Sequence, residues 1–201
     1  MAEFPEIPLG RGKVFIPIGD GTEMMDTLYP IFRLREEGYE PVVSGPEARM
    51  YNGVMHEIPP GEGVRWDITR EQASYHVRAT VAFRDARADD YCGLFLSGGR
   101  APEYLRYDKA LLELIRAFFA ANKPVAMVCH GVELAAAAGC LKGRTGTTVA
   151  KCELDITSFG GTYVDKPCVV DGNLVSGRTV LPAPLHPHAQ RRQPALILPA
   201  P

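Results

Sequence analysis

The sequence has no excess of either charge, no long apolar run and no paired cysteines. Its 22 basic and 24 acidic residues give a formal net charge of −2, whereas nucleic-acid-binding proteins need a strongly basic face for phosphate contacts. No segment reaches the roughly 18 consecutive apolar residues of a membrane-spanning helix, and the first residues lack the charged-then-apolar pattern of a signal peptide. These absences predict a cytoplasmic protein that contacts neither nucleic acid nor membrane.

The five cysteines are spaced in a way that excludes most cysteine chemistry except that of a free thiol. They stand at positions 92, 129, 140, 152 and 168, with no Cys-x-x-Cys pair. An odd number without regular spacing is a poor disulfide framework and a poor zinc site. The sequence therefore predicts reduced thiols and no metal, and it leaves at least one thiol available as a nucleophile.

The length and composition fit one soluble α/β domain. The chain has 201 residues, of which 46% are apolar and 23% are charged, an ordinary globular balance with enough chain for a sizeable core. An apolar run at 13–18 is followed by an apolar stripe over 22–37 and a second run at 41–44. This strand–helix–strand succession is typical of a parallel sheet with covering helices. By the same criteria we expect strands at 93–97, 124–128, 145–149, 168–170 and 174–176, and helices at 108–122 and 132–138.

Two segments depart from this strand–helix rhythm. Glycines and prolines mark loops between 46 and 90, where apolar and polar residues alternate over 75–84 and predict one strand with an apolar face. We interpret 46–90 as an extended excursion from a single domain at 12–180. From 181 to 201 the chain has six prolines in 21 residues, so we expect an extended tail rather than a helix.

Cys129 is the leading candidate for a nucleophile. It stands between a predicted buried strand and a predicted helix, and His130 and Gly131 follow it directly. A strand-to-helix elbow exposes a side chain at the carboxyl edge of the sheet, where α/β proteins bind ligands, and the helix N-terminus favours the thiolate. The alternative is a cysteine that only fills the core at a strand end. The adjoining His130-Gly131 pair and a second glycine loop favour the catalytic interpretation.

Two further loops point to the same edge of the sheet. Gly98 and Gly99 follow a predicted strand, and their N–H groups, with an amide near His130, could bind an oxyanion. An ordinary glycine turn is the alternative for this loop. Glu23 stands in the first turn after a glycine-containing loop. Spacing alone favours Glu23 as a carboxylate at a helix N-terminus, with proton sharing beside Cys129 as the alternative.

Three motifs, in this order along the chain, resemble the ThiJ/PfpI family, which includes the Parkinson-associated deglycase and the PfpI-type intracellular proteases. Residues 19–23 (GDGTE) are similar to the first loop of that family, 98–103 (GGRAPE) to its second signature, and 129–131 (CHG) to its nucleophile elbow. The resemblance covers residues 12–179. It implies an α/β, flavodoxin-like three-layer sandwich, in which helices cover both faces of a mostly parallel sheet.

The resemblance also implies a role for each site residue. Cys129 would be the nucleophile, and Glu23 would hydrogen-bond its sulfur and move protons. His130 would act as a base, oriented by Glu103 of a neighbouring subunit, so the family implies a homodimer or a larger homo-oligomer. It implies no cofactor. The oxyanion- and substrate-binding positions would be Gly98, Gly99 and Gly131.

The sequence departs from the family at two places. Val132 and Glu133 stand where many members have proline or alanine and then glutamine, and the proline-rich tail replaces a terminal helix. We expect a cofactor-free cysteine hydrolase or lyase of glyoxalase or deglycase type, acting on a small carbonyl, acyl or glycated compound. The alternatives are a PfpI-type intracellular peptidase or amidase, a non-enzymatic redox-responsive chaperone-like protein, and a member that has lost its function.

Overall fold

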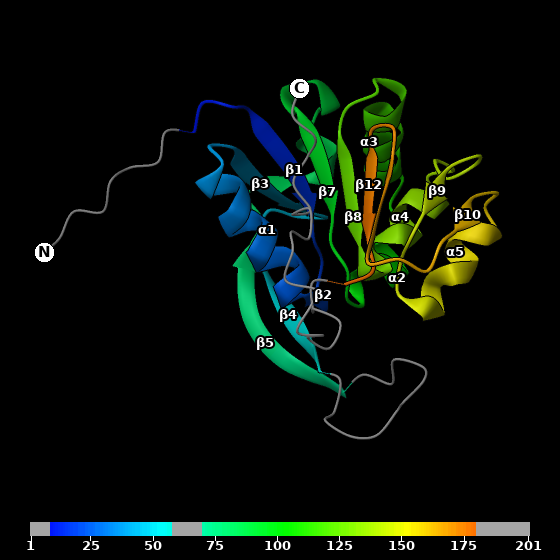
Figure 1. Ribbon diagram of the computed structural model, residues 1–201. Coiled ribbons are helices and arrows are strands. Elements are labelled where there is room, and N and C mark those ends of the chain that lie inside the picture. The colour runs from blue at the N-terminus through cyan, green and yellow to red at the C-terminus, as the bar shows by residue number, and fades with distance from the viewer. Residues whose placement is uncertain (1–8, 58–69, 180–201) are drawn as a thin grey trace, which may run out of the picture.

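The computed structural model describes residues 9–57 and 70–179, and a mostly parallel sheet runs through this part of the chain (Figure 1). Its strand order is β11-β12-β8-β7-β1-β3-β6, and every neighbouring pair is parallel except β11 and β12. The strands are β1 (Lys13–Pro17), β3 (Glu40–Gly45), β6 (Val81–Ala82), β7 (Gly93–Leu96), β8 (Val125–Val128), β11 (Cys168–Asp171) and β12 (Leu174–Gly177).

The centre of this sheet is apolar on both faces because helices cover both. Strands β7 and β8 are buried along their whole length, as expected for central parallel strands. Phe15 of β1 pairs with Val42 and with Leu94, and its ring packs 5.0 Å from that of Tyr91 and 6.2 Å from that of Phe118. These aromatic contacts tie the central strand to the helical layer behind it.

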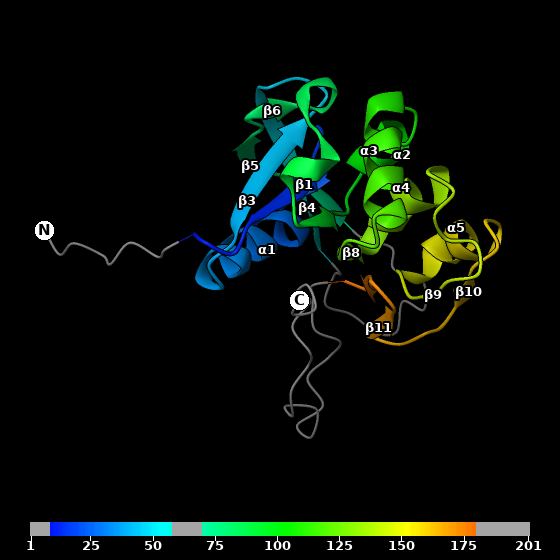
Figure 2. The same cartoon turned by 90° about the horizontal axis from the view of Figure 1, so that it is seen from above.

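Helices lie on opposite faces of the sheet (Figures 1 and 2). Helix α1 (Met24–Glu36) covers one face, and α3 (Lys109–Ala120) and α4 (Val132–Ala137) cover the other. In α3 the apolar residues recur at helical spacing and are buried, and the carboxylate of Asp108 caps the helix by accepting a hydrogen bond from Leu111 N at 3.0 Å. The predicted three-layer α/β sandwich is confirmed.

The excursion forms a hairpin outside the main sheet. Strand β4 (Met50–Glu57) pairs antiparallel with β5 (Arg70–Arg78) and parallel with the short β2 (Thr22–Glu23), which precedes α1. The single strand expected at 75–84 is wrong: β5 ends at Arg78, and the chain then turns back to the main sheet as β6. Tyr75, expected on an apolar face, is 73% exposed because β5 lies beyond the core.

Short elements complete the described chain and carry the loops around the site. They are α2 (Ala101–Leu105), α5 (Glu153–Thr157), β9 (Thr145–Gly146), β10 (Thr162–Tyr163) and the 3-10 turns η1 (Phe83–Asp85), η2 (Ala88–Asp90), η3 (Cys129–Gly131) and η4 (Ala150–Cys152). The strand expected at 145–149 is only two residues long. The domain boundary at 180 and the tail at 181–201 lie outside the described residues. None of the helices in residues 9–57 and 70–179 is long and apolar enough to cross a membrane.

Candidate functional site

Cys129 lies at a sharp elbow between β8 and the turn η3. Its φ angle is +53°, a left-handed conformation that costs a non-glycine residue about 1–2 kcal/mol. Two contacts hold the elbow in place. Thr148 Oγ1 donates a hydrogen bond to the Cys129 carbonyl at 2.7 Å, and Gly131 packs so closely on β7 that a Cβ there would lie 2.3 Å from Leu96 O. The surrounding structure therefore maintains the strained nucleophile conformation.

The thiol of Cys129 is buried and paired with the neighbouring imidazole. Its Sγ lies 3.2 Å from His130 Nδ1. Burial raises the pKa of the thiol well above its usual range, and the negative charge of Asp26 acts in the same direction, against smaller opposing effects of the His130 and Gly99 backbone N–H groups. The helix N-terminus favours the thiolate, and desolvation of the buried sulfur opposes it by raising the pKa of the thiol.

His130 complements this thiol. Burial, with smaller contributions from the charges of Lys151, His56 and Arg100, lowers the pKa of His130 to about 4. The imidazole is therefore neutral at pH 7, and its Nδ1 lies within hydrogen-bonding distance of the thiol. The structure therefore places a thiol and a neutral imidazole within hydrogen-bonding distance of each other.

The first and second loops meet beside the sulfur. Glu23 N donates a hydrogen bond to the Gly98 carbonyl at 3.1 Å, and Gly99 has a φ angle of +87°. A Cβ on Gly98 would lie 2.6 Å from Cys129 Cβ and 2.4 Å from Asp26 Oδ2. Both glycines are thus required by close backbone approach, and the Gly99 N–H is directed at the thiol.

Glu23 lies at the N-terminus of α1 and is buried. Its Oε2 accepts a hydrogen bond from Asp26 N at 2.6 Å, and its Oε1 accepts one from His56 N at 3.4 Å. Burial raises the pKa of its carboxyl group despite these N–H donors. No hydrogen bond joins Glu23 to the Cys129 sulfur among the residues that the structure describes. The geometry matches the helix-capping interpretation, and the proton-sharing role stays a prediction.

Glu103 lies on α2, where its carboxylate pairs with a neighbouring arginine. Its side chain is 45% exposed and forms an ion pair with Arg100, with 2.9 Å between Oε1 and Nε. Within the described part of the chain Glu103 makes no hydrogen bond to His130. A role in orienting a histidine would therefore have to be exerted on another subunit.

Several residues that line the site were not predicted from the sequence. The hairpin brings His56 next to the centre, with its ring 6.5 Å from that of His130. Glu71 Oε2, on the paired strand, lies within hydrogen-bonding distance of His56 Nε2, at 3.0 Å. Arg100 Nη1 lies 3.7 Å from the same Glu71 oxygen. No spacing in the sequence signals these contacts, because the folding of the hairpin over β2 creates them.

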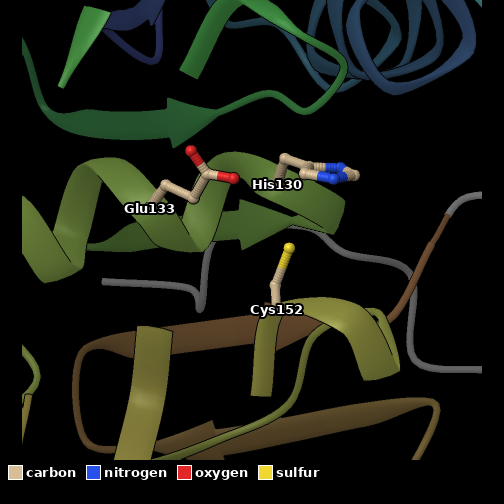
Figure 3. Close-up of side chains that lie close together, drawn as sticks. All are labelled: His130, Glu133 and Cys152. Carbon is tan, nitrogen blue, oxygen red and sulfur yellow. The ribbon is translucent and has the colours of Figure 1, made fainter. Parts of the chain in front are cut away.

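Three potential metal ligands, His130 among them, lie close together next to the Cys129–His130 pair (Figure 3). His130, Glu133 and Cys152 each offer one ligand atom, and these atoms lie within 4.8 Å of one another. The residues come from η3, α4 and η4 respectively. Sequence spacing predicted no metal, because Cys152 is far from the other two along the chain and belongs to no ligand motif.

Comparison with known proteins agrees with this geometry. Residues 12–185 match the model of the DJ-1/PfpI family. The chain is 35% identical to the Deglycase TK1284 of Thermococcus kodakarensis and 34% identical to the Deglycase PfpI of Pyrococcus furiosus, each over 166 residues that cover 83% of this chain and 89% of the relative.

Solved structures show the same fold. A two-domain protein of Anabaena variabilis, with DJ-1/ThiJ/PfpI-like and ferritin-like domains, superposes with a TM-score of 0.72 at 26% identity over 84% of this chain and 44% of that one. DJ-1beta of Drosophila melanogaster superposes with a TM-score of 0.67 at 19% identity, over 83% and 81% of the two chains. The family resemblance of the three loops is thus confirmed, and the chain belongs to the DJ-1/PfpI family.

Proposed function

We propose that this protein is a cofactor-free, cysteine-dependent enzyme of deglycase type that acts on small carbonyl or glycated compounds. The observation that carries the proposal is the Cys129–His130 pair, a thiol 3.2 Å from a neutral imidazole nitrogen at a strained elbow. The names of the relatives support the deglycase assignment. A nucleophile and a base within hydrogen-bond distance are the minimal requirement for covalent catalysis.

The reaction begins with a proton transfer within this pair. His130 Nδ1 takes the proton of the Cys129 thiol, and the thiolate adds to the carbonyl carbon of the substrate. A carbon–sulfur bond forms, the carbonyl π bond breaks, and its electron pair passes to the oxygen. The backbone N–H groups at Gly99 and His130, which face the sulfur, stabilise that negative charge. The protonated His130 then returns the proton to the oxygen and gives a neutral hemithioacetal.

Glu23 is the proposed second proton carrier. Its carboxyl group is buried beside Asp26 and His56, and burial raises its pKa, which brings a carboxyl group closer to the range useful for general acid–base catalysis at neutral pH. Rotation of the side chain away from Asp26 N would present it to the bound substrate. Gly98, Gly99 and Gly131 keep the surrounding backbone close to the thiol.

The peptidase alternative has less support than the deglycase assignment. The site lies under a hairpin that contributes His56 and Glu71, which restricts access and favours a small substrate over an extended peptide. The redox-sensor alternative uses the same Cys129 thiol, and it predicts selective oxidation of Cys129 by mild peroxide without turnover of any carbonyl compound.

The test compares Cys129→Ala with the matched control Cys140→Ala, a half-buried thiol outside the site. We expect Cys129→Ala to lower the turnover of methylglyoxal-type substrates by at least about a thousandfold, because removal of a nucleophile abolishes the covalent step. Cys140→Ala should retain the wild-type rate. Equal rates for Cys129→Ala and the wild type would reject the assignment.

A further inference from the structure

The cluster of His130, Glu133 and Cys152 contains two side chains, Glu133 and Cys152, that the proposed reaction does not use. From it we propose a site for a divalent transition-metal cation, with Zn²⁺ as the preferred ion. The three side chains approach from three different elements, and their ligand atoms lie within 4.8 Å of one another (Figure 3). Neither Glu133 nor Cys152 has a role in the Cys129–His130 chemistry.

The donor set selects the class of metal. An imidazole nitrogen, a carboxylate oxygen and a thiolate sulfur together suit Zn²⁺, whereas Mg²⁺ and Ca²⁺ prefer oxygen ligands alone. Three protein ligands leave the fourth tetrahedral position open to water or to another ligand. Binding displaces the proton of the Cys152 thiol to solvent, so that the sulfur coordinates as a thiolate.

Binding of Zn²⁺ requires the three ligand atoms to move only slightly closer together. Zinc–sulfur and zinc–nitrogen bonds of about 2.3 and 2.0 Å place tetrahedral ligand atoms about 3.5 Å apart, compared with distances of up to 4.8 Å in the structure. Side-chain rotations of Glu133 and Cys152 can supply this change of roughly 1 Å without backbone movement.

Burial and hydrogen bonding pre-arrange the ligands. Cys152 is 3% exposed and Glu133 is 6% exposed, so both are withdrawn from competing solvent. Arg106 Nη1 donates a hydrogen bond to Glu133 Oε2 at 3.3 Å, while its Nη2 interacts with Asp155 Oδ1 at 3.4 Å. The Arg106 guanidinium thus orients Oε2 of Glu133 and shares its charge with the carboxylate of Asp155. The other oxygen of Glu133, Oε1, makes no hydrogen bond in the described part of the chain. Such outer contacts are typical of metal sites.

Occupation of this site would oppose the thiol chemistry. A metal ion that coordinates the His130 ring withdraws electron density from it, so the ring accepts the Cys129 proton less readily. The proposal itself does not depend on the proposed function, because metal binding is measured directly.

The experiment titrates the full-length, chelator-treated protein with Zn²⁺ against a chromophoric competitor, and native mass spectrometry gives the stoichiometry. We expect one Zn²⁺ per chain, and at least a tenfold loss of affinity in Cys152→Ser and in Glu133→Gln. Cys140→Ser is the matched control and should bind as the wild type does. With Co²⁺, the wild type should show a sulfur-to-metal charge-transfer absorption that Cys152→Ser lacks.

A Cys129→Ser variant separates this site from the neighbouring thiol. Retained Zn²⁺ binding in Cys129→Ser supports the proposal. Loss of binding in Cys129→Ser together with full binding in Cys152→Ser overturns it, because the ion would then be held by the Cys129–His130 pair. Full binding in both Glu133→Gln and Cys152→Ser, or no binding by the wild type, also overturns it. Thermal unfolding of each variant, measured without metal, identifies a variant that fails to fold. If either Glu133→Gln or Cys152→Ser fails to fold, the conclusion rests on the other of these two variants.

Discussion

The missing side chain at Gly98 makes room for the Cys129 thiol. A methyl group there would meet the Cβ of the nucleophile and the carboxylate of Asp26, both closer than 3 Å. Because Cys129 is held by a strained backbone and by close packing of Gly131 on β7, it cannot easily move away. The distance between the Gly98 loop and the Cys129 elbow is therefore fixed by backbone contact rather than by flexible side chains.

We predict that Gly98→Ala impairs catalysis more than stability. The added methyl displaces the thiol from His130, so turnover should fall at least about a hundredfold, because small displacements of a reacting group are costly. The free energy of unfolding should fall by about 1–3 kcal/mol. Steady-state kinetics and urea unfolding measure the two effects.

Gly139→Ala is the control for this substitution. Unlike Gly98, Gly139 has a positive φ angle, and nothing lies within 4 Å of a Cβ there, so only the backbone strain of about 1 kcal/mol is expected, with normal turnover. Normal turnover in Gly98→Ala would show that the loop does not fix the position of the thiol.

At the residue scale, motifs that are local in the sequence could be predicted and contacts between distant segments could not. The pairing of Cys129 with His130 follows from adjacency at a strand end, and the closeness of Gly98 follows from the shared carboxyl edge of parallel strands. Asp26 lies near the Cys129 thiol, and Cys152 lies near Glu133, because of the way the loops pack. No residue spacing in the sequence encodes that packing. The raised pKa of the thiol also escaped prediction, because burial is a property of the folded chain.

The hairpin β4–β5 is anchored to the first loop by Asp20. Its Oδ1 accepts a hydrogen bond from Asn52 N at 2.9 Å, and its Oδ2 pairs with Arg49 at 2.6 Å. The hydrogen bond from Arg49 holds the pKa of Asp20 below its usual range. A carboxyl group with a lower pKa in the folded state stabilises the fold above its unfolded pKa and loses this effect as the pH falls.

We therefore predict that Asp20→Asn lowers the free energy of unfolding by about 0.5 kcal/mol at pH 7, a value suited to a half-exposed ion pair. The difference from wild type should shrink as the pH falls below about 4, where the wild-type carboxylate takes up its proton. Urea unfolding at several pH values measures this. Asp89→Asn, at an exposed position, is the control and should show no such difference; an effect of Asp20→Asn that is constant with pH would contradict the ion-pair explanation.

At the element scale, long apolar or strongly periodic segments were predicted well. Strands β1, β7 and β8 are continuous apolar runs, and α3 combines a helical stripe with a capping aspartate. Strand β4 was missed because it alternates weakly and pairs outside the core. Helices α2 and α5 are five residues each, too short for a periodic signal.

We predict that the surface around α2 contacts a second copy of the chain. Tyr104 and Tyr107 flank Glu103 and are 45% and 78% exposed, and aromatic residues are enriched at the cores of protein interfaces. Glu103 itself makes no contact with the His130 of its own subunit in the described residues. An interface at this surface would bring the glutamate to a neighbouring site, as the family resemblance implies.

A subunit-mixing experiment tests this arrangement. We expect Cys129→Ala and Glu103→Gln to be inactive separately, and a refolded equal mixture to regain up to about a quarter of the wild-type activity, because half of randomly formed dimers hold one intact site. Glu113→Gln, on the exposed side of α3, is the control and should remain active alone. Full activity of Glu103→Gln alone would refute a role for Glu103. Two inactive variants without recovery would place its action within one subunit.

The hairpin β4–β5 belongs to a small sheet of its own, separate from the main sheet that carries Cys129. Strand β4 pairs with the two-residue β2, β5 pairs with β4, and neither pairs with any of the seven strands of the main sheet. The two strands nevertheless carry His56 and Glu71 to the rim of the site. Cys129 and His130 lie on elements of the core, whereas His56 and Glu71 lie on a hairpin that the core holds through the buried side chains of Tyr51 and Val77. Substitutions at the exposed positions of the hairpin can therefore alter the rim of the site while the packed core stays unchanged, which makes these positions suited to redesign of substrate range.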